Sequence, residues 1–297
     1  MSDGALTRRQ AVALFAIVVL AWGLIWPVTK VLVESVPPIW TTALRCWIAL
    51  VALVVLLGAT RNLVVPTRAD APVVASIALL HMVGFSILMA AGVSRVPASK
   101  AVVLGYTTPL WVTLLAPVFL REPVTPGRLA GAALGLAGLL VLLNPLSLDW
   151  SDRRALVGYG YIVAAALLWA LSILYARKHR WIATPLQLLP WQIGLAGLVL
   201  TPLAFVFEGV PDVAWTPTLL SLFAFAGLVG TALGYWAMSM VNRSLPALTT
   251  SLGITATPIV GIAGGALLLG ERLDASLLVA AALIVGGIAV NALAERR

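Results

Sequence analysis

The sequence predicts an all-α integral membrane protein in which ten transmembrane helices form two inverted five-helix repeats around a central cavity. Composition, the spacing of uncharged stretches and an internal repeat all support this prediction. Hydrophobic residues make up 61% of the 297 residues and charged residues 10%, against about 45–50% and about 25% in ordinary soluble domains. This composition excludes a soluble enzyme, a disordered chain and a DNA-binding domain.

Ten apolar stretches are long enough to be transmembrane helices, because a helix needs about 20 residues to cross a hydrocarbon core of about 30 Å. They are almost free of Asp, Glu, Lys and Arg, and short loops join them. The alternating segments of a membrane β-barrel do not occur in the sequence. The predicted spans are 10–29, 38–60, 71–94, 101–120, 129–148, 155–176, 181–207, 213–242, 244–270 and 275–294.

Lys and Arg are distributed unevenly between the two sides of the predicted membrane. Most of the 19 basic residues fall on the side that carries both termini, and they do not cluster as a nucleic-acid-binding patch. Short cytoplasmic loops are enriched in Lys and Arg. We therefore expect a multi-pass protein of the cell inner membrane with both termini in the cytoplasm.

The chain contains an internal repeat. The stretch Trp22–Lys30 resembles Trp169–Arg177, and a Pro-Ala, Pro and Glu pattern in Pro97–Glu122 recurs with the same spacing in Pro246–Glu271. Five spans per repeat is an odd number, so the second half is expected to cross the membrane inverted relative to the first. Inverted repeats are typical of secondary transporters, whose substrate site lies near the midplane between the halves. The predicted repeats are residues 8–148 and 155–295.

These motifs resemble the drug/metabolite transporter superfamily, EamA type. The resemblance covers nearly the whole chain, and within the superfamily the chain looks most like the bacterial aromatic amino-acid and methionine exporters. The second half departs from the motif of the first, with Ala170 in place of Gly23, Leu174 in place of Pro27 and Arg177 in place of Lys30. These differences weaken the case for equal roles of spans 1 and 6.

Two polar residues inside the predicted spans are candidate substrate-binding residues. His81 lies near the middle of span 3, where a polar ring is costly and is expected to face a cavity or a partner. It can donate a hydrogen bond to substrate or carry a proton, or it can bond a neighbouring helix. Arg45 lies in span 2, and its guanidinium matches the geometry of a carboxylate; a helix–helix bond or snorkelling to the interface is the alternative.

Aromatic residues at depth and one amide complete the candidate substrate site. Aromatic rings inside a bundle can line a cavity for a planar apolar ligand, with their N–H or O–H groups as polar contacts; core packing or contact with lipid is the alternative. Trp169 is the preferred candidate because it falls in the repeated motif, and Gln192 occupies the position equivalent to Arg45. The remaining aromatic candidates are Trp22, Tyr106, Trp191, Tyr235 and Trp236.

Prolines inside the spans are candidate hinges, because each removes a backbone donor and can kink its helix. Pro109 and Pro258 occupy equivalent positions in the two repeats, so they are the best candidates for hinges that let each half rock. Pro27 in span 1 is a third candidate. Static kinks are the alternative.

The residues that are absent narrow the function. No Asp or Glu lies in the interior of a predicted span, whereas a pump for lipophilic cations needs a buried carboxylate. The single cysteine, Cys46, excludes an internal disulfide. Paired carboxylates, a Ser–His–acid set, a metal-spaced His cluster and a phosphate-binding loop do not occur, which disfavours an enzyme. A scaffold would not need a histidine at mid-bilayer depth.

Together with the family resemblance, these features predict a secondary transporter that exports small metabolites by alternating access, above all aromatic and other apolar amino acids such as methionine. A multidrug or other small-metabolite exporter, with or without proton coupling, is the alternative. A nucleotide-sugar-type anion exchanger would need more basic residues at mid-depth than Arg45 alone. The expected partners are an amino-acid-like substrate and the lipid bilayer, with no nucleic acid, organic cofactor or metal, and the expected state is a monomer.

Overall fold

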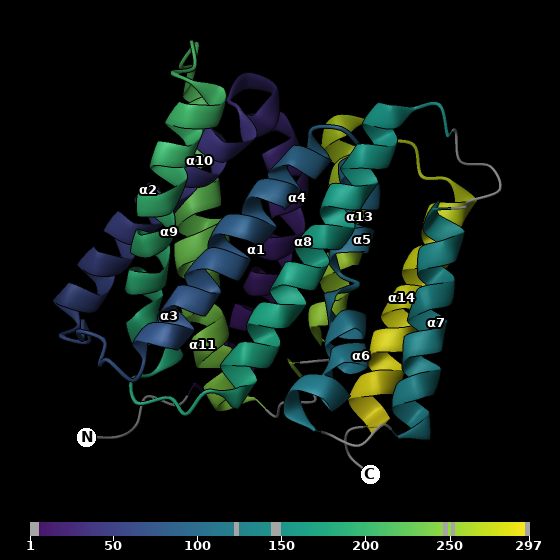
Figure 1. Ribbon diagram of the computed structural model, residues 1–297, viewed down its shortest axis with the longest axis horizontal. Coiled ribbons are helices and arrows are strands. Elements are labelled where there is room, and N and C mark those ends of the chain that lie inside the picture. The colour runs from purple at the N-terminus through teal and green to yellow at the C-terminus, as the bar shows by residue number, and fades with distance from the viewer. Residues whose placement is uncertain (1–5, 122–124, 144–149, 246–248, 251–252, 295–297) are drawn as a thin grey trace.

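A computed structural model of the chain describes residues 6–121, 125–143, 150–245, 249–250 and 253–294, and the described residues form helices and connecting loops without strands (Figure 1). The first half contains α1 (Arg8–Ser35), α2 (Pro38–Ala59), α3 (Ala71–Ser76), η1 (Ile77–Phe85), α4 (Ser86–Val93), α5 (Ala98–Gly105), α6 (Thr108–Leu120) and α7 (Pro126–Leu143). The second half contains α8 (Arg153–Lys178), α9 (Pro185–Glu208), α10 (Pro217–Ala224), η2 (Phe225–Leu233), α11 (Gly234–Ser244), η3 (Ile254–Ala256), α13 (Thr257–Leu269) and α14 (Ala275–Ala294).

The helices agree with the predicted spans. Among the described residues, 9 helical segments are long and apolar enough to cross a membrane, and Ile254–Leu269 is a shorter apolar helical segment. The spans Ala71–Val93 and Pro217–Ser244 each combine an α-helix, a π-helix and a second α-helix. The predicted fold class, an all-α integral membrane protein, is therefore confirmed.

Each of these two composite spans contains a π-helix of 9 residues, at the same place in its repeat. The wider turn is accompanied by hydroxyl bonds to a carbonyl five residues earlier: Ser86 Oγ donates to the His81 carbonyl at 3.4 Å, and Thr231 Oγ1 donates to the Ala226 carbonyl at 2.8 Å. Such π-turns are uncommon and occur frequently at functional sites. No residue pattern in the sequence marks these π-helices, so they could not be predicted from it.

Breaks in the helices occur next to two of the three candidate hinge prolines. The helical path is interrupted at Tyr106–Thr107, and Pro109 is the second residue of α6. In the other repeat, the short 3₁₀ turn η3 precedes α13, whose second residue is Pro258. Proline suits the first turn of a helix, where its missing N–H is not needed. Pro27, in contrast, is buried inside the uninterrupted α1.

Close helix packing explains the glycines that recur along the spans. Helices α7 and α14 lie side by side at one edge of the bundle (Figure 1). A Cβ atom added at Gly131 would lie 2.7 Å from the carbonyl oxygen of Gly287, so only glycine permits this approach. Small residues allow helices to associate in lipid, where no hydrophobic driving force brings them together.

Carboxylates at the helix ends join the two repeats. Glu271 accepts hydrogen bonds from the backbone N–H groups of Ala98 at 2.6 Å and Ser99 at 2.8 Å, at the start of α5. Glu208, at the end of α9, accepts backbone bonds in the first turn of α2, with the Ile39 N–H at 3.0 Å. Acidic groups satisfy the free N–H groups of a helix N-terminus and complement its dipole. Glu271 and Glu208 therefore have a structural role at helix ends, and Glu122, which corresponds to Glu271 in the first repeat, lies outside the described residues.

Asp70 makes a third contact between the repeats. Its side chain is fully buried in the connection between α2 and α3, and it accepts the N–H groups of Ile182 and Ala183, each at 3.1 Å. His179 Nε2 lies 3.3 Å from the same carboxylate. Burial acts to raise the pKa of Asp70, but the bonds from Ile182, Ala183, His179 and Thr67 outweigh burial and lower this pKa below its usual value.

Candidate functional site

A cavity of about 970 Å³ lies between the two repeats. It opens at the face where α1 begins and α8 ends, which we call the mouth face, and its rim includes Trp181, Thr184 and Arg243. Its deep end reaches Trp26 in α1 and Tyr106 at the break between α5 and α6. No described residue of the loops at the opposite face, the closed face, lines it. The volume lies in the range of small-molecule binding sites, about 300–1,000 Å³.

Aromatic rings form a compact box around His81 in this cavity. The His81 imidazole stacks on the Trp169 indole, with ring centroids 5.1 Å apart and planes 6° from parallel. Phe85 contacts both rings, at 5.3 Å from His81 and 5.0 Å from Trp169. Tyr106 meets the Trp169 ring edge to face at 6.3 Å. The packing fixes the orientation of His81 and leaves flat apolar surface toward the cavity.

Tyr235 links this box to the second repeat. Its hydroxyl lies 3.4 Å from His81 Nε2, within hydrogen-bonding distance, and its ring is 6.1 Å from the imidazole. Trp22 packs against the other edge of Tyr235 at 5.6 Å. His81, Trp169, Tyr235 and Trp22 come from four different membrane spans, so a ligand in the box would contact both halves of the protein.

Arg45 places a positive charge in the cavity wall. Its Nη2 atom donates to Ser86 Oγ at 2.8 Å, and its Nε atom is buried without a partner in the described part of the chain. Among the described lining residues none is Asp or Glu, so the cavity offers this guanidinium no carboxylate. A charge with incomplete solvation in an apolar wall favours the binding of an anionic group.

Gln192 supplies a second polar group in the wall formed by α9. The residue is 3% exposed and lines the cavity. Its Nε2 atom has no hydrogen-bond partner among the described residues. A buried amide of this kind is costly unless a ligand or water accepts its hydrogen bond, so Gln192 is a donor available to a ligand.

The structure corrects two of the aromatic candidates. Trp191 is 39% exposed and its Nε1 donates to the Val64 carbonyl at 2.8 Å, outside the cavity. Trp236 packs against a hydrophobic cluster of α1 and α11 and does not line the cavity. Neighbouring residues of an α-helix point about 100° apart. In α9 and α11 this rotation places Gln192 and Tyr235 in the cavity wall and leaves Trp191 and Trp236 outside it. His81, Trp169, Tyr106, Arg45, Trp22, Gln192 and Tyr235 all line it.

Several lining residues were not among the candidates. Phe85 follows His81 by four positions, which places the two on the same side of a helix, and this spacing was the available signal. Met82, Met89 and Ser172 also line the cavity. Nothing in the sequence distinguishes them from residues that face lipid, because both environments are apolar.

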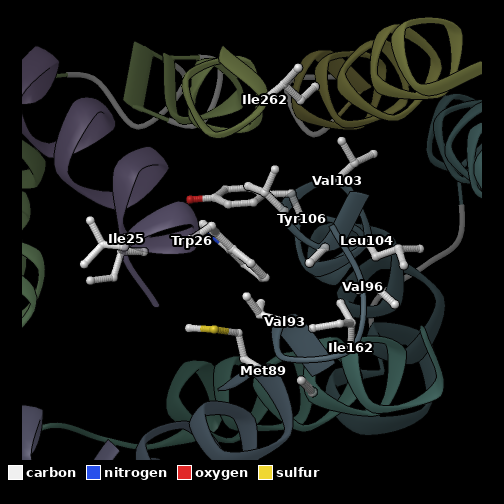
Figure 2. Close-up of a cluster of buried hydrophobic side chains, with 14 of the residues drawn as sticks. Ile25, Trp26, Met89, Val93, Val96, Val103, Leu104, Tyr106, Ile162 and Ile262 are labelled. Atoms are coloured by element: carbon white, nitrogen blue, oxygen red, sulfur yellow. The ribbon is translucent and has the colours of Figure 1, made fainter. Parts of the chain in front are cut away.

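The closed face is separated from the cavity by a hydrophobic cluster. In Figure 2 the indole of Trp26 lies between Tyr106 and Met89, with Val93 beyond it. The indole packs directly on Gly105, the last residue of α5, where an added Cβ would lie 2.6 Å from the Trp26 Cζ2 atom. The cavity is therefore open at one face and plugged by packed side chains at the other.

The family follows from comparison with known proteins. The model of the EamA-like transporter family matches the chain twice, over residues 9–144 and 156–293. The chain belongs to the EamA-like transporter family. It is therefore a membrane transporter, and its multi-pass architecture with a cavity between the halves agrees with that function.

Similar proteins span almost the whole chain. The "Uncharacterized transporter YoaV" of Bacillus subtilis is 27% identical over 92% of this chain and 94% of its own length. The "Probable amino-acid metabolite efflux pump" of Escherichia coli is 28% identical over 96% of this chain and 95% of its own length. The "Aromatic amino acid exporter YddG" of Ancylobacter novellus is 28% identical over 72% of this chain and 74% of its own length.

Proposed function

We propose that this transporter exports amino acids with aromatic and other apolar side chains, methionine included, by alternating access. The observation that carries the proposal is a single cavity that holds both the aromatic box and the Arg45 guanidinium, which has no carboxylate partner among the described lining residues. The similar proteins that are named for amino-acid and amino-acid metabolite efflux support this choice of substrate.

The proposed substrate contacts follow from the chemistry of the wall. The rings of Trp169, Phe85 and Tyr106 would hold the side chain of the amino acid by stacking and apolar contact. Arg45 would pair with the carboxylate through charge-assisted hydrogen bonds. His81 and Gln192 would contribute further hydrogen bonds. The site would then select a carboxylate at one end and an apolar group at the other.

Two alternative cargoes fit the wall less well. A lipophilic cation needs a counter-charge at depth, and the described lining residues supply no carboxylate. A nucleotide sugar carries a diphosphate, which would call for several convergent basic groups. Besides Arg45, the described lining holds only Arg243 as a permanently charged base, and Arg243 lies at the rim.

Alternating access is proposed from the inverted repeats. The halves 8–148 and 155–295 would rock relative to each other, with the helix breaks beside Pro109 and Pro258 as hinges and the substrate bound near mid-depth. We further propose that the chain lies in the cell inner membrane with its mouth face in the cytoplasm, so that this structure is an inward-open state. Because a single chain forms the whole cavity, a monomer would suffice.

Transport by the purified protein in liposomes tests the proposal. Labelled tryptophan, phenylalanine and methionine are expected to exchange across the membrane, and Trp169→Ala should abolish most of this exchange. Trp191→Ala is the matched control, since it removes the same side chain outside the cavity, and it should transport normally. Transport of a lipophilic cation without transport of any amino acid would contradict the proposed cargo, as would equal effects of the two substitutions.

A further inference from the structure

The turn between α4 and α5 on the closed face is held by a cation from α1. Lys30 Nζ donates to the carbonyl oxygens of Val93 at 2.8 Å and Val96 at 3.2 Å. Val93 is the last residue of α4, and Val96 lies in the turn that follows, where the last helix carbonyls lack amide partners and the helix dipole favours a positive charge. Lys30 thereby joins the C-terminal part of α1 to the end of α4.

An anion holds the other side of the same turn. Glu271, which follows α13, accepts the first N–H groups of α5. The end of α4 therefore has a positive side chain and the start of α5 a negative one, which is the favourable sign at each helix terminus. Together with the plug around Trp26, these contacts close the face opposite the mouth.

The second repeat contains the corresponding residues in a different arrangement. By the two repeat motifs, Arg177 at the end of α8 corresponds to Lys30. Asn242 in α11 and Leu245 just after α11 correspond to Val93 and Val96. Arg177 is exposed and makes no hydrogen bond or ion pair in the described part of the chain. Asn242 lines the cavity near its mouth. The contact that Lys30 makes with the end of α4 at the closed face is therefore not made by Arg177 at the mouth face, in the described part of the chain.

We propose that Lys30 and Arg177 are alternating clasps that set which face of the transporter is closed. In the opposite-facing state, Lys30 releases the α4 carbonyls, and the Arg177 guanidinium binds the backbone carbonyls of Asn242 and Leu245. Inverted repeats support this exchange, because swapping the conformations of the two halves generates the opposite-facing state. The inference rests on alternating access in the proposed function and does not depend on the identity of the cargo.

The chemistry suits both residues. Lysine and arginine are donors without acceptor atoms, so each needs an acceptor, and the carbonyl oxygens of a helix end supply one. Backbone carbonyls at a helix end remain available whatever the side chain is, which allows Val93 to be replaced by Asn242 at the corresponding position. The first motif has lysine and the second has arginine at this position. Both residues keep the positively charged hydrogen-bond donor that a clasp needs.

Accessibility of one cysteine to a membrane-impermeant maleimide tests the proposal without any substrate. Ser172 lines the cavity and is 3% exposed, so Ser172→Cys in a Cys46→Ala background is labelled from whichever face the cavity opens to. The measured quantity is the ratio of labelling from the closed face to labelling from the mouth face. It is compared in Lys30→Met and Arg177→Met proteins reconstituted in sealed liposomes of known orientation.

The two substitutions are expected to move this ratio in opposite directions. Loss of the Lys30 clasp, which makes two charge-assisted hydrogen bonds, should raise it about tenfold or more, because losing one such bond already corresponds to about tenfold. Loss of Arg177 should lower it by a similar factor. Lys30→Arg should restore the wild-type ratio. Matched controls are Arg153→Met, which removes an exposed base at the start of α8 on the closed face, and Lys178→Met, which removes the base next to Arg177. Neither should change the ratio.

Shifts in the same direction, or an unchanged ratio in a labelled and monodisperse protein, would overturn the clasps. If Lys30→Met fails to fold, Arg177→Met decides the test, because the exposed Arg177 side chain is not needed for packing in this state. An unchanged ratio in Arg177→Met then overturns the proposal. Opposite shifts in a protein that moves no amino acid would support the clasps while refuting the proposed cargo. The two proposals can thus fail separately.

Discussion

Replacing Arg45 with glutamine should weaken the binding of substrates that carry a carboxylate. The guanidinium is held by Ser86 at 2.8 Å, and the described lining of the cavity offers it no Asp or Glu. A hydrogen bond to a charged group contributes about 1.5–3 kcal/mol, and each step of about 1.4 kcal/mol is a factor of ten in affinity. We therefore expect the KM for tryptophan to rise by about 10- to 100-fold.

The assay compares tryptophan with its amide, in which a neutral carboxamide replaces the carboxylate, in the same liposomes. Tryptophan amide keeps the indole but lacks the carboxylate, so Arg45→Gln should change its transport less than about threefold if Arg45 acts through charge. Arg243→Gln is the matched control, because it removes the same group from the rim of the cavity. It should leave the KM for tryptophan within about twofold, as expected for a charge exposed to water.

Two results would refute this account of Arg45. An equal loss for tryptophan and its amide would mean that Arg45 supports the shape of the cavity and does not bind the carboxylate. An unchanged KM for tryptophan would place the carboxylate elsewhere in the cavity, with Gln192 and His81 as the remaining donors.

Three further predictions concern packing and the contacts between the repeats. Gly105→Ala should lower the free energy of unfolding by about 1–3 kcal/mol through overpacking against Trp26. The control Gly160→Ala, whose added Cβ meets nothing within 4 Å, should not lower it. Thermal unfolding in detergent measures both variants, and equal stability would refute the close contact at Gly105. Asp70→Asn should lower the melting temperature at pH 7, and this effect should shrink as the pH falls below about 4. A carboxyl whose pKa is lowered contributes its full stability above its ordinary pKa and loses that contribution as the pH falls through the lowered pKa. A pH-independent effect would contradict this. Glu271→Gln should cost about 1 kcal/mol through the lost charge at a helix N-terminus, and an unchanged melting temperature would contradict that role.

Much of the architecture could be predicted because lipid imposes a simple rule on sequence. Spans must be apolar and about 20 residues long, and the repeated Pro97 and Pro246 patterns revealed the duplication. His81 could be singled out because a polar ring at mid-depth is rare in an apolar span. Its position in the aromatic box agrees with that expectation, although its binding role is still a prediction.

The face of each helix was harder to predict. In a soluble protein the apolar face of a helix is its buried face and the polar face is exposed. In this protein both the lipid-facing and the cavity-facing surfaces are rich in aromatic residues. Trp191 was therefore as plausible as Gln192 from sequence, and only the rotation of α9 in the bundle separates them. The burial of Asp70 could not be predicted from the sequence either, because its partners are backbone amides of a loop that is distant in the chain.

Protection of the cavity by substrate tests the central claim most directly. The rate of maleimide labelling of Ser172→Cys from the mouth face, in the Cys46→Ala background, is measured at increasing tryptophan concentration, with Lys178→Cys as a reporter outside the cavity. We predict that labelling of Ser172→Cys slows with half-protection near the KM for transport, while the outside reporter is unaffected. Undiminished labelling of Ser172→Cys in a protein that still transports tryptophan would contradict the claim and place the substrate pathway elsewhere.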